Sequence, residues 1–205
     1  RVLWITPLRA LAGDTEASLR QPLDRLGLPW RLESRTGDSK ASTKARQLKR
    51  LPTALITTPE SLSLMLTHEK LLEQFSQLEG VIVDEWHELL GTKRGVQTEL
   101  ALARLRKLNP ALRVWGLSAT LGNLEQAQQA LVGSAPANDV RIIEGYSKKR
   151  LQLESIIPAR IESFPWSGHI GTRMVPQVAE KIESVNSTLV FANTRSQTEI
   201  WYLQL

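Results

Sequence analysis

Short apolar runs alternate with longer segments of helical periodicity along the first two thirds of the chain. The apolar runs are typical of strands buried on both faces, and they fall at 2–5, 54–57, 81–83 and 114–117. Helical patterns follow them at 8–26, 60–75, 96–108 and 123–132. This alternation predicts an α/β fold in which helices cover both faces of a parallel sheet.

A polar and basic segment at 145–150 interrupts this pattern. Leu151, Leu153 and Ile156 then predict a connecting strand, before prolines and a glycine break the pattern. A second unit follows, predicted as helix 172–185, strand 188–192 and helix 195–205. About 40 residues cannot close a core of this kind. We therefore expect a first α/β domain, a linker with the connecting strand, and the beginning of a second domain, at 1–144, 145–168 and 169–205.

The composition is that of a globular protein, with 41% hydrophobic and 23% charged residues in a chain of 205. Cysteine is absent, which excludes disulfide scaffolds, thiolate metal sites and cysteine nucleophiles. No apolar run is long enough to span a bilayer and no leader pattern opens the chain. We expect a cytoplasmic protein without membrane contact. Because the sequence opens at Arg1 inside a strand pattern, we also expect a fragment of a longer parent.

Positive charge is concentrated at 31–50, a segment with seven basic and two acidic residues. The resulting net charge of +5 equals that of the whole chain. A local field of this kind attracts polyanions such as nucleic acids. A solvated helix face would give the same pattern, so both interpretations stay open.

Two carboxylates stand at the end of the strand at 81–83, in the sequence Asp84-Glu85-Trp86-His87. Ligands of open parallel sheets bind at the carboxyl ends of the strands. Asp84 is a candidate ligand of hydrated Mg²⁺, with Glu85 in the outer coordination sphere. Glu85 would orient or deprotonate a water that attacks a phosphate, and His87 would sense the same site. The alternative is that these acidic residues cap the helix that follows.

Hydroxyl residues with proline or glycine follow other apolar runs, as Thr6-Pro7, Thr58-Pro59-Glu60-Ser61 and Thr36-Gly37-Asp38. Proline is tolerated in the first turn of a helix, and the free N–H groups of that turn can bind a phosphate. Three such segments would hold a sugar–phosphate backbone without reading its sequence. Each alone could equally be an ordinary strand–helix turn.

Six segments occur in an order that resembles the motifs of superfamily 2 helicases. They lie at 6–11, 36–38, 57–62, 84–87, 118–120 and 189–195, and they look like motifs Ia, Ib, Ic, II, III and IV of the DExH-box branch. The sequences at 84–89 and 164–169 resemble the large helicase-related (Lhr) group. Within that group they are most similar to the ligase-associated DNA-repair helicases.

The resemblance implies a RecA-like first domain, the beginning of a second RecA-like domain, and an ATP-dependent helicase or translocase that uses ATP and Mg²⁺. It favours single-stranded DNA as the nucleic acid, a role in DNA repair, and a ligase or nuclease as partner. The implied catalytic residues are Asp84, Glu85, His87, Ser118 and Thr120. The implied nucleic-acid contacts are Thr6, Pro7, Arg9, Thr36, Gly37, Asp38, Thr58, Pro59, Glu60 and Ser61, together with Asn193, Thr194 and Arg195 from the second domain.

The chain departs from the family pattern because it contains no Gly-x-x-x-x-Gly-Lys-Ser/Thr loop. In the family that loop binds the triphosphate, and we expect it upstream of Arg1, with the late second-domain motifs beyond Leu205. The chain alone is therefore predicted to hydrolyse ATP negligibly. A non-catalytic module that binds single strands is the alternative function, whereas a metal-dependent nuclease would need more clustered carboxylates.

Six tryptophans are many for this length, and exposed tryptophan can stack on bases. Trp4 and Trp115 lie inside strand patterns, so we expect both in the core. Trp86 and Trp166 could be either buried or exposed. Arg195, likewise, could be a solvated residue at a helix start rather than a strand contact.

Overall fold

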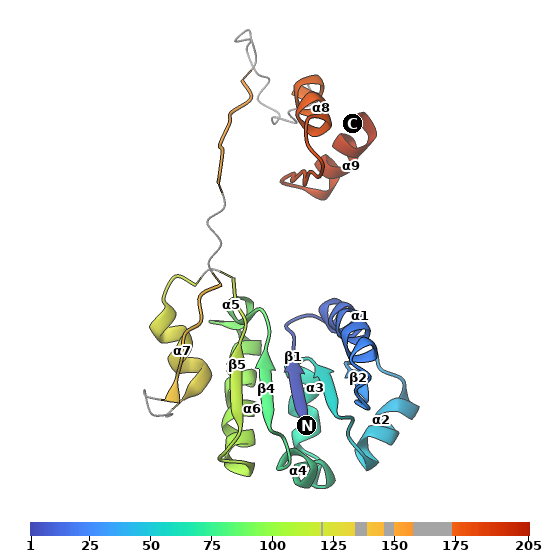
Figure 1. Cartoon of the computed structure of the whole chain (residues 1–205), viewed down its shortest axis with the longest axis vertical. Helices are drawn as coiled ribbons and strands as arrows, with labels where there is room; N and C mark the ends of the chain where they lie inside the picture. Colours follow the sequence, from blue (N-terminus) through green and yellow to red (C-terminus); the bar gives the residue numbers. More distant parts are fainter. Residues whose placement is uncertain (120, 134–138, 146–149, 158–173) are drawn as a thin grey trace. The chain divides into compact units, whose positions relative to one another are not determined.

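The computed structural model describes residues 1–119, 121–133, 139–145, 150–157 and 174–205. The chain divides into two compact units, Arg1–Ile143 and Glu144–Leu205. In the described residues, the first unit holds a sheet with its covering helices, and the second holds two helices (Figure 1). None of the described helices is both long and apolar enough to span a membrane.

The described part of the first unit contains a five-stranded parallel sheet in the order β2-β3-β1-β4-β5. The strands are β1 Val2–Ile5, β2 Leu32–Arg35, β3 Ala54–Thr57, β4 Gly80–Val83 and β5 Arg113–Gly116. Val2 is in register with both Ala54 and Gly80, so β1 lies at the centre. Because all strands run the same way, the loops that follow them share one side of the sheet, called the carboxyl edge below.

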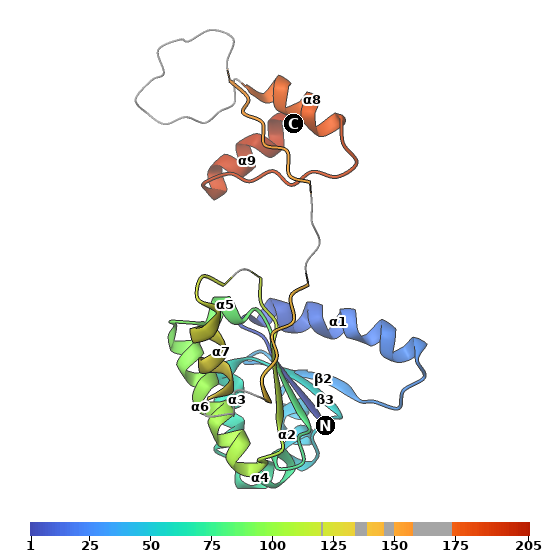
Figure 2. The ribbon, with the colours of Figure 1, turned by 60° about the vertical axis from the view of Figure 1, so that its left-hand side comes forward.

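Helices cover both faces of the sheet, as the alternation of strand and helix predicts. Their bounds are α1 Arg9–Arg25, α2 Ala41–Lys49, α3 Pro59–Leu66, α4 Glu69–Phe75, α5 Trp86–Leu89, α6 Lys93–Leu108 and α7 Leu124–Val132. Figure 2 shows α3, α6 and α7 on one side of the sheet and α1 on the other. The parallel sheet between two helical layers confirms the predicted α/β class.

The larger core lies under α3, α4, α6 and α7. Alternate strand residues such as Leu3, Ile5 and Val81 are fully buried there against Leu62 and Leu102. Each such side chain contributes about 1.5–3 kcal/mol relative to an exposed one. The opposite face has a smaller cluster under α1. The loops of the carboxyl edge therefore rest on a rigid sheet.

Burial is incomplete on the face that α1 covers. Trp4 is partly buried beside that cluster. Trp115 in β5 is 55% exposed, so its predicted place in the core is wrong. The apolar run correctly predicts a strand, but β5 is one of the two edge strands of the described sheet, and α1 packs mainly against β2 and β3.

Two local features of the first unit differ from the prediction. Strand β2 was not predicted, because Glu33 and Ser34 dilute its apolar pattern and an outer strand tolerates such residues. The single helix predicted at 60–75 is two helices, α3 and α4. At the break, the N–H groups of Thr67 and His68 donate to residues only three positions back, and such tight turns end a helix.

The second unit contains α8 Val175–Glu183 and α9 Arg195–Gln204, close to the two predicted helices. The strands predicted around Leu151–Ile156 and at 188–192 are wrong, because neither described segment is paired in a sheet. Leu189 and Phe191 are more than 80% exposed. The apolar alternation predicts burial, but a strand also needs a neighbouring strand to bond to, and the described residues of this unit provide none.

Candidate functional site

The segments of the first unit that are predicted to carry function follow its strands and therefore lie on its carboxyl edge. The sheet order places them, from one side to the other, at 36–38, 58–61, 6–9, 84–87 and Ser118. The candidates for nucleic-acid contact thus follow β2, β3 and β1, and the catalytic candidates follow β4 and β5. Thr120 lies outside the described residues.

Asp84 is held by three hydrogen bonds at the end of β4. Its N–H donates to the carbonyl of Ile5 at 2.8 Å. Its Oδ2 accepts from the indole Nε1 of Trp4 at 3.2 Å, and its Oδ1 accepts from the N–H of Glu85 at 3.0 Å. A carboxylate has about four lone-pair sites, so both oxygens can accept a further ligand while these bonds fix the orientation.

Glu85 adopts a left-handed backbone conformation, with φ 46° and ψ 47°. It is the sole non-glycine residue of positive φ in the described residues, and such a conformation costs about 1–3 kcal/mol. The next residue, Trp86, is anchored by two hydrogen bonds. Its N–H donates to the carbonyl of Leu117 at 2.9 Å, and its indole Nε1 donates to the carbonyl of Ala127 at 2.9 Å. The buried anchor maintains the strained turn at Glu85.

Trp86 is 2% exposed, so it belongs to the core and cannot stack on a base in this structure. Trp166, the other tryptophan whose environment the sequence left open, lies outside the described residues. The sequence alone could not separate these cases, because the apolar partners of Trp86 come from distant segments such as α7.

His87 links the acidic turn to the loop that follows β5. Its Nδ1 lies 3.1 Å from the Oγ of Ser118 and 3.5 Å from Oε2 of Glu85. Its Nε2 lies 3.5 Å from Oε1 of Glu88. Either tautomer can bond to the serine, because a hydroxyl both donates and accepts. The structure thus brings Glu85, His87 and Ser118 together, as the order of the motifs suggests.

The carboxylate oxygens at this turn suit a cation whose remaining ligands are water and substrate phosphates. No group of three or more His, Cys, Asp or Glu side chains able to hold a metal occurs in the described residues. Asp84 and Glu85 offer oxygen atoms only. Mg²⁺ commonly takes one or two carboxylates and completes its shell with water and substrate phosphates. Asp84 is therefore suited to Mg²⁺ that arrives with a nucleotide, and unsuited to a metal bound by protein alone.

The turn at 36–38 is held by cations from two helices. Arg9 Nη1 lies 2.8 Å from Oδ1 of Asp38, and Lys44 Nζ donates to the carbonyl of Gly37 at 2.8 Å. A Cβ atom at Gly37 would come within 3.0 Å of the Arg9 guanidinium. The Asp38 N–H donates to the Thr36 hydroxyl at 3.3 Å. Arg9 and Asp38 remain mostly exposed.

The hydroxyl groups after β1 and β3 are buried and bonded locally. Thr6 Oγ1 donates to the carbonyl of Leu8 at 3.2 Å, and Thr58 Oγ1 lies 3.4 Å from Oγ of Ser61. The buried candidates here are Thr6, Pro7, Thr58, Pro59 and Ser61. The first N–H groups of a helix lack partners inside the helix. Any phosphate contact here therefore falls to backbone N–H groups at the start of α1 and, in α3, to that of Ser61, because Pro59 has no N–H and the Glu60 N–H bonds to its own carboxylate.

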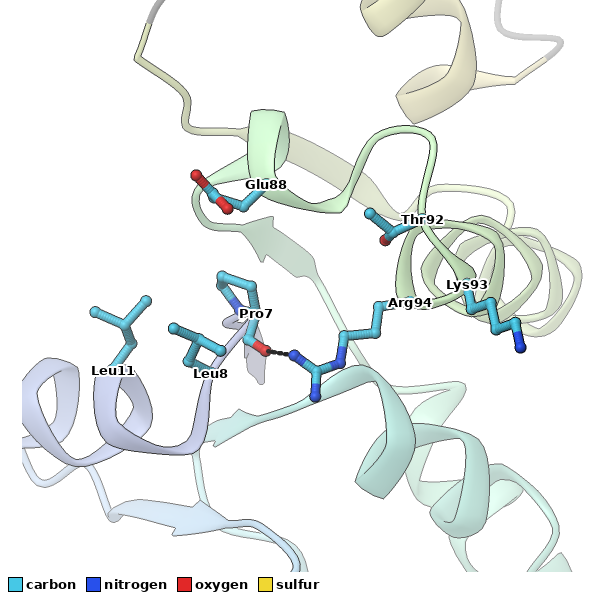
Figure 3. Close-up of a pocket in the computed structure, with 7 residues that line it drawn as sticks. All are labelled: Pro7, Leu8, Leu11, Glu88, Thr92, Lys93 and Arg94. Carbon is cyan, nitrogen blue, oxygen red and sulfur yellow. Dashed lines mark hydrogen bonds between the residues drawn. The ribbon is translucent and has the colours of Figure 1, made fainter. Parts of the chain in front are cut away.

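Arg94 joins two of these segments, although no motif in the sequence points to it. Its Nε lies 2.6 Å from Oε1 of Glu60, and its Nη1 donates to the carbonyl of Pro7 at 3.1 Å. Figure 3 shows the bond to Pro7 at the wall of a cavity of about 390 Å³. The cavity is lined by Pro7, Leu8, Leu11, Glu88, Thr92, Lys93 and Arg94. The adjacent Gly95 was the available signal, since glycine near a helix start often marks close packing.

The environment of Glu60 lowers the pKa of its carboxyl below the ordinary 4.5. Partial burial alone would raise this pKa. Hydrogen bonds from its own backbone N–H and from the Thr58 hydroxyl, together with the charge and hydrogen bond of Arg94, outweigh the effect of burial. Glu60 is therefore a carboxylate at neutral pH and a stable partner for Arg94.

Some basic side chains of the stretch at 31–50 are already bonded to protein groups within the first unit. Four of its seven cations bond to protein groups in this fully described segment: Arg31, Arg35, Lys44 and Arg46. Arg35 is buried, and burial lowers the pKa of its guanidinium. Lys40, Lys49 and Arg50 are exposed. The stretch therefore combines a structural role with a smaller exposed positive surface.

The second-unit candidates lie at the start of α9. Thr194 caps this helix, because its Oγ1 accepts from the N–H of Gln197 at 3.2 Å. Asn193 is exposed. The Arg195 side chain is 95% exposed and lies 3.8 Å from Glu199. Thr194 thus has a structural role, whereas Arg195 is open to solvent, as either interpretation of it requires.

Known proteins match the chain along most of its length. It is 38% identical over 208 residues to the ATP-dependent helicase Lhr-Core of Methanocaldococcus jannaschii, a match of 97% of the chain and 24% of that protein. It is 36% identical to the Lhr helicase/probable uracil glycosylase of Mycolicibacterium smegmatis, a match of 97% of the chain and 14% of that protein. The chain therefore spans about a quarter or less of these relatives.

The fold is similar to that of solved helicases. The structure of Mycobacterium smegmatis helicase Lhr bound to ssDNA and AMP-PNP matches with a TM-score of 0.75 and 35% identity, over 98% of the chain and 27% of that protein. Helicase MrfA bound to DNA and AMPPNP matches with a TM-score of 0.72 over 100% of the chain and 29% of that protein. At 20% identity, the second likeness shows the fold alone. These matches confirm the predicted RecA-like fold.

The family model of the DEAD/DEAH box helicases matches residues 1–127, which include every candidate segment of the carboxyl edge. This match and the Lhr relatives confirm the resemblance inferred from the order of the motifs. The narrower likeness to ligase-associated helicases stays a prediction. The chain belongs to the DEAD/DEAH box helicase family.

Proposed function

We propose that this chain is part of an ATP-driven motor that moves along nucleic acid and unwinds it. The observation that carries the proposal is the order of the segments on the carboxyl edge. The acidic turn follows β4, and the segments suited to a sugar–phosphate backbone follow the neighbouring strands β1, β3 and β2. Relatives named ATP-dependent helicases, one of them solved with ssDNA and AMP-PNP, support the same function.

In this proposal Asp84 would hold the Mg²⁺ of a bound nucleotide, and Glu85 would orient or deprotonate the attacking water. The bound ion supplies positive charge to the phosphates. The bonds from Trp4 and from the Glu85 N–H fix the Asp84 carboxylate, and His87 with Ser118 ties the turn to the loop after β5. The sequence holds no phosphate-binding glycine–lysine loop, so we assign hydrolysis to the whole parent protein.

The nucleic-acid strand would lie along the segments that follow β2, β3 and β1. Arg9 and the turn at 36–38 offer a cation and exposed backbone, and the starts of α1 and α3 offer N–H groups. Asn193, Thr194 and Arg195 would contact the strand from the second unit. We propose single-stranded DNA as the track and DNA repair as the setting. The cytoplasmic location and a ligase or nuclease partner remain predictions.

The experiment that tests this function measures ATP hydrolysis by the whole parent protein. It is run without nucleic acid, with single-stranded DNA and with single-stranded RNA of the same sequence. We expect DNA to stimulate turnover more than RNA does. Stimulation by RNA alone would reassign the track. Strand binding without any hydrolysis would instead favour the non-catalytic binding module.

A further inference from the structure

One guanidinium connects three neighbouring strands of the carboxyl edge. Arg94 Nη1 donates to the carbonyl of Pro7 at 3.1 Å (Figure 3). Its Nε lies 2.6 Å from Oε1 of Glu60. Pro7 follows β1, Glu60 follows β3, and Arg94 is reached from β4 through α5. These strands are adjacent in the order β3-β1-β4. Arg94 therefore sets the spacing between the turn after β1 and the first turn of α3.

The backbone that carries Arg94 is itself fixed. Thr92 caps α6: its Oγ1 accepts from the N–H of Gly95 at 3.1 Å and donates to the carbonyl of Leu89 at 2.7 Å. A Cβ atom at position 95 would lie 2.1 Å from that same carbonyl oxygen, so the start of α6 is pressed against the end of α5. The buried Thr98 donates to the Arg94 carbonyl at 2.8 Å. Arg94 thus extends from a rigid base.

The arrangement requires arginine rather than any cation. Its two protein contacts use different nitrogen atoms of one planar group, Nε and Nη1. A lysine ammonium is a compact point charge and does not present this fork. Arg94 also neutralises the Glu60 carboxylate, which would otherwise repel a phosphate at the start of α3.

We propose that Arg94 is a positioning residue for nucleic-acid binding, which holds the segments after β1 and β3 at the spacing that lets both contact one sugar–phosphate backbone. This inference rests on the proposed function. It differs from a direct phosphate contact, because both bonds of the guanidinium go to protein atoms. The two roles differ in salt dependence: removing a phosphate contact lowers the log–log slope by about 0.7 for a single strand, whereas loss of positioning leaves the slope unchanged.

The test measures the affinity of the whole protein for a single-stranded DNA oligonucleotide across a series of salt concentrations. The variants are Arg94→Lys, Arg94→Gln and Glu60→Gln. Lys93→Gln is the matched control, because Lys93 is the neighbouring cation on the same cavity. We expect Arg94→Lys and Arg94→Gln to weaken binding about fivefold to tenfold with an unchanged salt slope, as expected for partly exposed charge-assisted bonds.

ATPase assays on the same variants separate positioning from general damage. For Arg94→Lys we expect a higher DNA concentration for half-maximal stimulation and a turnover at saturating DNA close to that of the parent. Glu60→Gln keeps a hydrogen-bond acceptor, so we expect a smaller effect, under about threefold. Thermal unfolding midpoints close to the parent value would show that each variant is folded.

The outcomes distinguish this inference from the proposed function. If the parent protein binds DNA but Arg94→Lys binds equally well, or Arg94→Gln lowers the salt slope by about 0.7, Arg94 is not a positioning residue. An effect of Lys93→Gln as large as that of Arg94→Gln would overturn the inference as well. If the parent binds no single strand at all, the proposed function fails, and the inference fails with it.

Discussion

The Nδ1 atom of His87 lies 3.1 Å from the Oγ atom of Ser118, and this contact joins α5, which follows β4, to the loop after the neighbouring strand β5. Glu85, the candidate for orienting water, lies 3.5 Å from the same nitrogen. Trp86 adds a bond from its N–H to Leu117, one residue before the serine. A shift of the β5 loop would therefore be transmitted to the acidic turn.

The His87–Ser118 contact predicts a specific loss in the whole protein. His87→Ala should keep nucleotide binding and lower DNA-stimulated ATP turnover about tenfold to a hundredfold, because a small misplacement of a reacting group has effects of this size. Steady-state ATPase with and without DNA measures it. Ser118→Ala should act in the same direction, and the double variant should be no worse than His87→Ala. Losses that multiply would show that the two residues act separately.

Replacing the buried Trp86 should lower the free energy of unfolding more than replacing an exposed tryptophan. Trp86→Phe keeps the ring but leaves the carbonyl of Ala127 without the indole donor, so the free energy of unfolding should fall by about 1–3 kcal/mol. Trp115→Phe is the matched control, because Trp115 is 55% exposed, and it should change stability by less than about 0.5 kcal/mol. Urea unfolding of the chain measures both. Equal losses would contradict the anchoring role of Trp86.

The lowered pKa of Glu60 predicts the sign of a pH effect. A carboxyl group whose pKa falls on folding stabilises the protein fully above its unfolded pKa, near 4.5. That contribution is lost as the pH falls through the lower folded value. Because Glu60 and Arg94 are about half exposed, it should stay below about 1 kcal/mol. The stability difference between the parent and Glu60→Gln should be constant above pH ~5 and shrink below it. A difference that increases at low pH would contradict the lowered pKa of Glu60.

Breaking the Arg9–Asp38 ion pair should raise the affinity for single-stranded DNA. Asp38→Asn removes a negative charge beside the proposed track and releases Arg9, so single-strand affinity should rise about threefold to tenfold at low salt, with a steeper salt slope. Glu69→Gln, the same charge change in α4, is the control, since α4 leads toward the start of β4 and lies away from the carboxyl edge (Figure 1). Fluorescence anisotropy measures both. An unchanged affinity for Asp38→Asn would place the strand elsewhere.

The sequence predicts the parts of this site that are local in the chain. An apolar run followed by Asp84 and Glu85 predicts a buried strand with carboxylates at its end, and the structure has that arrangement. The proline at the first position of α3 follows from the same kind of pattern, whereas Pro7 lies two residues before α1 begins. These features depend on neighbouring residues only, so an amino-acid pattern is enough to place them.

Features that depend on distant partners could not be predicted. Arg94 bonds to a residue 87 positions away, and no local pattern identifies that partner. The exposure of Trp115 depends on which helices cover β5, and the strand predicted at 188–192 needs a neighbour that its own sequence does not specify. The net charge of 31–50 likewise conceals that Arg35 is buried within the unit.

ATP turnover of Glu85→Gln in the whole protein, measured with saturating single-stranded DNA, tests the central claim most directly. The substitution removes the group that orients or deprotonates water and leaves Asp84 to hold the metal ion. We predict that turnover falls about 10²- to 10⁴-fold, while binding of a fluorescent ATP analogue stays close to that of the parent protein. Turnover close to the parent value would contradict the assignment of this turn as the hydrolytic site.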